Sequence, residues 1–159
     1  MPKLRRRFSL VEVLIITGVA AAFAAVAVVA ANPAHQFNKA MEAQRLNLQR
    51  WSDVNAIADA VYQYANDKAA FPDTIAAAAG EICRTGAGDC SSLIDLSALT
   101  ANGAYLVSMP VDPHCPAACA ANGTGYTIVK DTDNDIVVTA PNAEFGATIN
   151  TARRYGAQH

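Results

Sequence analysis

Basic residues are scarce in this chain of 159 residues once its first seven positions are set aside. Four of the twelve lysines and arginines lie at positions 3–7, so the remaining chain holds eight basic against fourteen acidic residues, a net charge of −6. Binding to nucleic acid requires clustered lysines and arginines that neutralise phosphates. Only Arg153 and Arg154 form a further basic pair, so we expect no direct binding to nucleic acid.

The sequence also lacks the residue patterns of a catalytic or zinc site. Its three histidines, His35, His114 and His159, are scattered, and Ser91 and Ser92 have no histidine–carboxylate pattern near them. No pair of cysteines has the C-x-x-C spacing that is typical of zinc ligands. A nucleophile needs a base within reach, and nothing in the sequence suggests one. We therefore predict that the protein is not an enzyme.

A long apolar run follows the basic segment 1–7. Residues 8–31 include a single charged residue, Glu12. A bilayer core of about 30 Å is crossed by about 20 helical residues, whereas a cleaved secretory signal has an apolar core of about 7–15. The run therefore predicts one transmembrane helix. Because basic residues stay on the cytoplasmic side, the chain after residue 31 is expected outside the cytoplasm.

The four cysteines, Cys83, Cys90, Cys115 and Cys119, all lie in the part expected outside the cytoplasm, where disulfides form and persist. Four cysteines allow three pairings. We favour Cys83–Cys90 (ICRTGAGDC) and Cys115–Cys119 (CPAAC), because each closes locally over a turn-rich sequence. A metal site is the alternative, with His114 as the nearby imidazole.

A second helical pattern occupies residues 32–67. Its apolar residues recur at spacings of three, four and seven, no glycine interrupts it, and AFPD follows it. Because a proline kinks a helix without necessarily ending it, Asn32-Pro33 is compatible with one bent helix from about Ser9 to about Asn66. The apolar positions are Phe37, Met41, Leu48, Trp51, Val54, Ala58, Val61 and Ala65, and the charged positions, placed mostly on other faces, are Lys39, Arg45, Arg50, Asp53 and Asp59.

Residues 68–143 have the composition of a globular head, with glycine-containing turns between short β-prone segments. YTIVK at Tyr126–Lys130 and IVVTA at Ile136–Ala140 flank DTDND and predict a β-hairpin. A long helix followed by a small antiparallel sheet predicts an α+β fold, in which the sheet buries its apolar face on the second half of the helix. The expected helical contacts include Trp51, Val54 and Val61.

Three other segments carry weaker signals. YLVSM at Tyr105–Met109 is predicted to be a third short strand or an extended run, and LIDLSAL at Leu93–Leu99 a short helix or a loop. The polar, weakly patterned residues 144–159 are expected to form a loose tail.

The segment DTDND is a candidate calcium loop. Asp131, Asp133 and Asp135 match its D-x-D-x-D opening. The glycine expected at the sixth position is replaced by Ile136, and the glutamate expected at the twelfth by Asn142. We therefore favour a solvated hairpin turn over a calcium site, and expect no other cofactor.

The first residues, MPKLRRRFSLVEVLI, combine a basic segment, an aromatic residue and a glutamate at the start of an apolar helix. This arrangement resembles the class III signal of type IV pilin-like proteins, whose usual pattern is F-T-L-x-E-L. In that family a prepilin peptidase cuts before an aromatic residue, so the resemblance implies cleavage between Arg7 and Phe8 and methylation of the new N-terminus. Arg7 departs from the family, which places glycine or another small residue there and thereby allows close backbone approach.

The resemblance extends into the head. MPVDP at Met109–Pro113 and GYTI at Gly125–Ile128 are similar to a proline–aspartate segment and a first hairpin strand of pilins and major pseudopilins, some of which bind calcium near their C-terminus. The similarity covers most of the chain and is strongest over residues 3–31. It implies a pilin-like fold, with a long N-terminal helix on a small antiparallel sheet.

The resemblance also implies a role for Glu12. A carboxylate inside a membrane is unfavourable by roughly 2.5–3.5 kcal/mol at the bilayer centre. Cleavage would create a cationic amine on Phe8, and an opposite charge largely removes the penalty of a buried ion. In the family, such a glutamate pairs with the N-terminal amine of another copy and aligns the two. The alternative is that Glu12 stays hydrated near the membrane surface beside the basic segment.

The implied function is that of a structural subunit, a pilin or pseudopilin, of a type IV pilus or a related secretion pseudopilus. It would polymerise through its N-terminal helix. Expected partners are other copies of the chain, membrane lipid, the prepilin peptidase, an inner-membrane platform protein and an assembly ATPase. The subunit would cross the inner membrane once and then enter an extracellular pilus or a periplasmic pseudopilus. The alternative is a singly anchored extracytoplasmic binding protein that does not polymerise.

Overall fold

The computed structural model describes residues 11, 14–15 and 33–154. By its internal contacts the chain divides into two units, Met1–Met41 and Glu42–His159. In the first unit, Val11, Leu14 and Ile15 are helical and exposed. Most of the predicted membrane segment 8–31 lies outside the described residues. Within the described part of the chain, no helix is both long and apolar enough to cross a membrane.

The long helix α2 runs from Pro33 to Lys68. Its C-terminal limit agrees with that of the helix predicted over residues 32–67. The helix ends where the backbone of Ala69 turns to a φ of 57° and Pro72 follows, and proline cannot continue a helix. Lys68 in the last turn places a positive charge at the negative end of the helix dipole.

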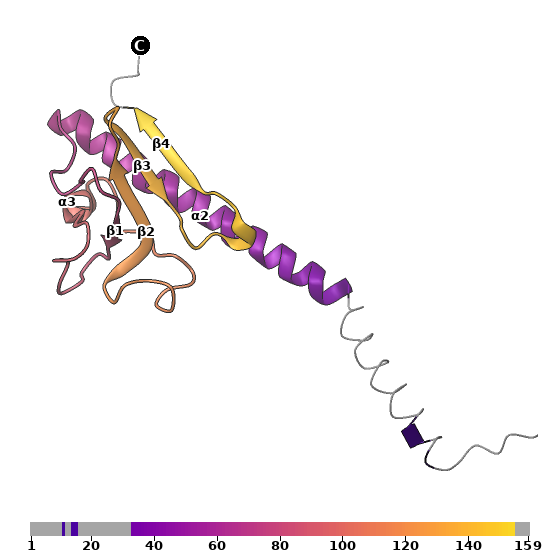
Figure 1. Ribbon diagram of the computed structural model, residues 1–159. Coiled ribbons are helices and arrows are strands. Elements are labelled where there is room, and N and C mark those ends of the chain that lie inside the picture. The colour runs from indigo at the N-terminus through magenta and orange to yellow at the C-terminus, as the bar shows by residue number, and fades with distance from the viewer. Residues whose placement is uncertain (1–10, 12–13, 16–32, 155–159) are drawn as a thin grey trace, which may run out of the picture. The chain divides into compact units, whose positions relative to one another are not determined.

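Four antiparallel strands form one sheet, in the order β1-β2-β3-β4 (Figure 1). Strands β2 and β3 are the predicted hairpin, in which Ile128 lies opposite Val138. The strands are β1 (Gly80–Cys83), β2 (Gly123–Lys130), β3 (Asp135–Thr139) and β4 (Asn150–Arg154); the short helices are α3 (Ser97–Thr100), η1 (Ala101–Gly103) and η2 (Glu144–Gly146).

The core of the second unit lies between α2 and one face of the sheet, which α2 crosses in Figure 1. Val54, Ile57 and Val61 are fully buried on the helix, and their spacings of three and four place them on one face. The sheet contributes alternate residues of β2 and β3, since side chains on a strand alternate between its two faces. These buried strand residues are Tyr126, Ile128, Ile136 and Val138. The α+β fold, with a long helix on a small antiparallel sheet, is thus confirmed.

Three expectations about the head were wrong. The loose tail expected over residues 144–159 is ordered as far as residue 154, because Asn150–Arg154 pair with β3 through backbone hydrogen bonds that polar residues make as well as apolar ones. Of the two alternatives given for residues 105–109, a strand or an extended run, the strand is wrong. Trp51 is 41% exposed and is not a core residue, because it lies about 60° around the helix from Val54.

Candidate functional site

The residues predicted for processing and assembly, Arg7, Phe8 and Glu12, lie outside the described residues. The chemistry that the structure does describe belongs to the globular head and to the part of α2 on which the head packs.

A buried ion pair joins α2 to the loop before β2. Arg50 and Asp112 both have fully buried side chains. The Arg50 Nε atom donates to Asp112 Oδ2 at 2.7 Å, and Nη2 donates to Oδ1 at 3.3 Å. Two parallel hydrogen bonds of this kind fix the relative orientation of guanidinium and carboxylate. The pair therefore sets the position of the loop on the helix.

Further polar groups surround this pair. Arg50 Nη1 donates to Asn47 Oδ1 at 3.1 Å, and the same nitrogen lies 3.6 Å from Glu144 Oε1. Glu144 Oε1 also lies 3.1 Å from Nε2 of the half-exposed His114. Asn47 accepts a hydrogen bond from the Glu144 backbone N–H and donates one to its carbonyl. This polar cluster therefore binds the η2 turn to α2.

Burial opposes the charge on Arg50, but its hydrogen bonds with Asp112 and the negative charges of Asp112 and Glu144 outweigh that effect and raise its pKa. Asp53, on the next turn of α2, accepts a hydrogen bond at 2.7 Å from the hydroxyl of Tyr126 on β2. Burial raises the pKa of Asp53, and the nearby charge of Asp112 adds to the increase, although the hydrogen bond from Tyr126 lowers it. Burial and the Asp53 carboxylate raise the pKa of Tyr126. The groups are linked structurally and electrostatically, and none is positioned as an isolated nucleophile.

Sequence reasoning missed this cluster. The charged residues of the helix are predicted to lie mostly on other faces, and Arg50, which is fully buried, is an exception. It precedes Val54 by four residues and Ile57 by seven, so the helical spacing itself put Arg50 on the buried face. Its partner, Asp112, lies in MPVDP, a segment noticed only for its resemblance to pilins.

Both locally closed disulfides are present, and together they use all four cysteines. Cys83 is bonded to Cys90 and Cys115 to Cys119. These are the pairings favoured from the sequence. Metal binding by the cysteines, the alternative, is incompatible with these bonds because a metal ligand must be a free thiolate.

The Cys115–Cys119 loop packs against the start of β2. Gly125 has a φ of 79°, a conformation that other residues rarely adopt. A Cβ atom at this position would also lie 2.8 Å from the Sγ atom of Cys119 and 2.8 Å from the Cβ atom of Asp112. Glu81 on β1 accepts hydrogen bonds from the backbone N–H groups of Gly125, at 2.8 Å, and Ala120. The loop that carries Asp112 is therefore fixed by its close contact with Gly125 of β2 and by the hydrogen bond from Ala120 to Glu81 of β1.

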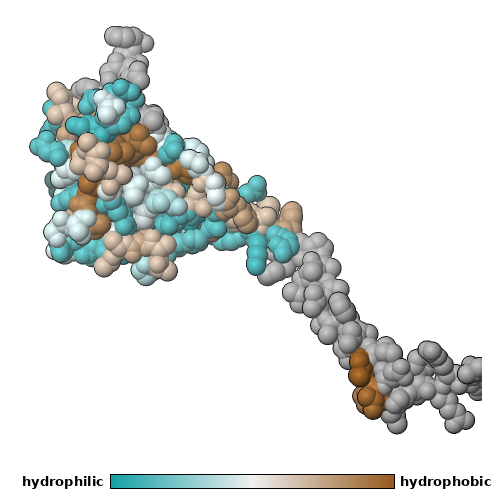
Figure 2. Space-filling view, viewed as in Figure 1, coloured by the Kyte–Doolittle hydropathy of each residue, from teal (hydrophilic) through white to brown (hydrophobic). Residues whose placement is uncertain are grey.

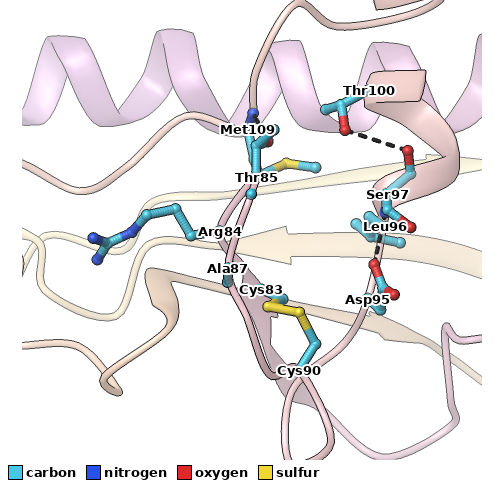
Figure 3. Close-up of a pocket in the computed structure, with 11 residues that line it drawn as sticks. Cys83, Arg84, Thr85, Ala87, Cys90, Asp95, Leu96, Ser97, Thr100 and Met109 are labelled. Atoms are coloured by element: carbon cyan, nitrogen blue, oxygen red, sulfur yellow. Dashed lines mark hydrogen bonds between the residues drawn. A yellow bond between two sulfur atoms is a disulfide. The ribbon is translucent and has the colours of Figure 1, made fainter. Parts of the chain in front are cut away.

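The Cys83–Cys90 disulfide lines a hollow of about 110 Å³ (Figure 3). Its polar groups bond mostly to one another: Thr85 Oγ1 accepts from the Met109 backbone N–H, and Asp95 Oδ1 accepts from that of Ser97. In Figure 3 the Arg84 side chain points away from these residues, and its Nη2 donates to the Gly123 carbonyl. The hollow therefore lacks a convergent set of charged groups of the kind that holds a substrate.

The calcium candidate forms an ordered turn. Asp131 Oδ1 accepts hydrogen bonds from the backbone N–H groups of Asp133 and Asp135, both at 2.9 Å. Asn134 closes the turn with a φ of 65°. In the part of the chain that the structure describes, no three histidine, cysteine, aspartate or glutamate side chains are grouped to hold a metal ion.

The surface of the head carries no single large apolar area on the side drawn in Figure 2, where hydrophobic and hydrophilic residues interleave.

Comparison of the chain with family models, curated proteins and solved structures finds no match.

Proposed function

We propose that the protein is a structural subunit, a pilin or pseudopilin, that polymerises through its N-terminal helix into a type IV pilus or a related secretion pseudopilus. The observation that carries this proposal is the spacing of Phe8 and Glu12 between a basic segment and an uninterrupted apolar run. An isolated membrane carboxylate is unfavourable, and an amine on Phe8 of a neighbouring copy would neutralise it.

Two features of the head support the proposal. An α+β head built on the second half of a long helix is the arrangement that the resemblance implies. Its two disulfides fit a location outside the reducing cytoplasm. The polar cluster around Arg50 would then be structural, because it fixes the loops of the head on the helix that joins the head to the fibre.

The N-terminus of the mature protein tests the processing step. Mass spectrometry of the protein isolated from producing cells is expected to find a chain that begins at Phe8 with a methylated amine. A chain that begins at Met1 would instead favour the alternative, a singly anchored protein that does not polymerise.

Replacement of Glu12 tests the assembly step. Glu12→Ala is expected to reduce incorporation into fibres at least tenfold, measured by immunoblotting of sheared fibres, because the neighbouring amine loses its partner. Glu42→Ala is the matched control, since Glu42 is an exposed glutamate that pairs with Arg45 on the same helix. Normal fibre incorporation of Glu12→Ala would refute the registry role of this residue.

A further inference from the structure

The two edges of the four-stranded sheet differ in how they are closed. On the β1 side a loop segment lies along the edge, where Ile94 pairs with Ile82 in a parallel bridge. The Ile94 carbonyl accepts from the Cys83 N–H at 2.9 Å, and the Ile94 N–H donates to the Glu81 carbonyl at 2.8 Å. On the other side β4 is the last strand (Figure 1), and within the described residues no segment pairs with its outer edge. Such an edge presents unpaired backbone donors and acceptors.

The register of β4 on β3 identifies the backbone groups at this open edge. The five residues of β4 pair with β3 without a bulge. Just before β4, in the same register, the Ile149 carbonyl accepts from the N–H of Ala140 at 2.9 Å. In an antiparallel pair, positions bonded in this way alternate with positions whose N–H and C=O point away from the partner strand. The N–H and C=O groups of Asn150, Ala152 and Arg154 therefore face outward.

The charge of β4 indicates which kind of strand fits this edge. Arg153 and Arg154 are adjacent, in a chain whose residues 8–159 carry a net charge of −6. A second β4, with the sequence NTARR, would bring four arginines onto neighbouring strands with no acidic residue among them, and like charges on neighbouring strands are destabilising. Carboxylates on the added strand have the opposite effect. The edge therefore excludes a copy of itself and selects an acidic strand.

We propose that the outer edge of β4 binds an extended, acidic peptide segment of another protein, which adds one strand to the sheet. Hydrogen bonds to the outward backbone groups of Asn150, Ala152 and Arg154 supply the affinity, as in other cases of strand addition. Carboxylates level with Arg153 and Arg154 supply the selectivity. This contact uses the head and does not rest on the proposed function.

Binding of synthetic peptides to the full-length chain in non-ionic detergent micelles tests the selectivity. Five paired residues at about 3.4 Å per residue span about 17 Å, so a seven-residue peptide covers the edge. The acidic probe alternates valine with glutamate, and the basic probe has lysine in place of glutamate. By fluorescence anisotropy, the acidic probe is expected to bind at least tenfold more tightly at low ionic strength, and salt is expected to reduce this preference. Equal binding of the two probes overturns the proposal.

Amide hydrogen exchange, followed by NMR, locates the bound probe. The outward N–H groups of Ala152 and Arg154 are expected to exchange at least fivefold more slowly when the acidic probe is bound. Those of Thr151 and Arg153 face β3 and are expected to change less than twofold. A bound probe that slows neither Ala152 nor Arg154 overturns the proposal. Slowing that appears without a probe as the protein concentration rises would show that a second copy occupies the edge, and it also overturns the proposal.

A proline at the edge tests the backbone contact. Ala152→Pro removes an outward N–H that makes no bond to β3, and edge strands accept proline at such positions. It is expected to weaken binding of the acidic probe at least fivefold. Ala152→Ser keeps the N–H and is expected to bind normally. Slow exchange of the Thr151 and Arg153 N–H groups checks that β4 remains paired in both variants. Unchanged binding by Ala152→Pro with β4 still paired overturns the proposal.

A charge variant keeps the test decisive if proline disturbs β4. Arg153→Gln combined with Arg154→Gln removes both charges, retains every backbone group, and is expected to abolish the preference for the acidic probe. Lys3→Gln combined with Arg5→Gln is the matched control, because the basic segment 1–7 also attracts an acidic peptide. This control is expected to keep the preference. If the preference is lost in the control and kept in the strand variant, the acidic probe binds the basic segment and the proposal is overturned.

Discussion

Two stretches of α2 are attached to the head by different physical means. From Val54 to Ala65 the buried positions are hydrocarbon side chains that pack on the sheet. From Asn47 to Arg50 the attachment is polar, through the Asn47 amide and the Arg50 guanidinium. Apolar side chains can pack against many different apolar neighbours, whereas a buried charge requires one oppositely charged partner in the correct geometry. The first stretch therefore supplies stability, and the second determines where the loops at Asp112 and Glu144 lie.

The largest effect is expected in the polar stretch. Asp112→Ala leaves the Arg50 guanidinium buried without its partner and is expected to destabilise the head by about 3–5 kcal/mol. Urea unfolding of the full-length chain in detergent micelles, followed by Trp51 fluorescence, measures the change. The double variant Arg50→Met/Asp112→Leu is expected to regain most of the loss, because no buried charge remains. A loss for Asp112→Ala below about 1 kcal/mol, as expected for an exposed ion pair, would contradict the importance of this pair.

The hydrocarbon stretch is expected to respond in a graded way. Ile57→Ala is expected to destabilise the head by about 3 kcal/mol and Ile57→Val by about 1 kcal/mol, because each removes buried methyl groups and leaves a cavity. Leu48→Ala is the matched control on the same helix, and at 71% exposure it is expected to change the stability by less than about 0.5 kcal/mol. Equal losses from positions 48 and 57 would show that Leu48 is covered within the folded chain, contrary to its exposure in the structure.

The smallest effect is a change in pH dependence at the junction of the two stretches. Burial raises the pKa of Asp53 in the folded head. The folded state therefore holds a proton where the unfolded state has lost it, so this residue's contribution to stability falls as the pH rises from about 3.9 through the raised folded pKa. Asp53→Asn removes that charge and retains an oxygen that can accept from Tyr126.

Comparing the unmodified chain with Asp53→Asn separates the pH dependence that Asp53 contributes from that of the other carboxylates. The free energy of unfolding of the unmodified chain, minus that of Asp53→Asn, is expected to decrease between pH 3.5 and pH 7. A difference that increases with pH would mean that the folded head stabilises the Asp53 carboxylate, contrary to the effect of its burial.

The features predicted correctly from the sequence are those that depend on nearby residues. The helical spacing of α2 and its end follow from its apolar pattern and from the proline after it, and the β2–β3 hairpin follows from two β-prone segments around a polar turn. The two disulfides join cysteines seven and four residues apart. In each case the deciding interaction is local.

The features that were missed depend on distant partners. Asn150–Arg154 has a polar sequence and becomes β4 only because the edge of β3 offers backbone hydrogen bonds to it. Trp51 lies within the predicted apolar stripe, but the sheet covers only one side of the helix, so this residue is exposed.

The sequence by itself determined the long helix, the hairpin and the charge pattern of the N-terminal segment, because periodicity, turn residues and charge are properties of short stretches of chain. Only the tertiary structure decided that Arg50 is buried against Asp112, 62 residues away, and that Leu48 is left exposed. The physical reason is that burial and charge pairing depend on which distant surface covers a residue, and a periodic helix offers several faces to be covered.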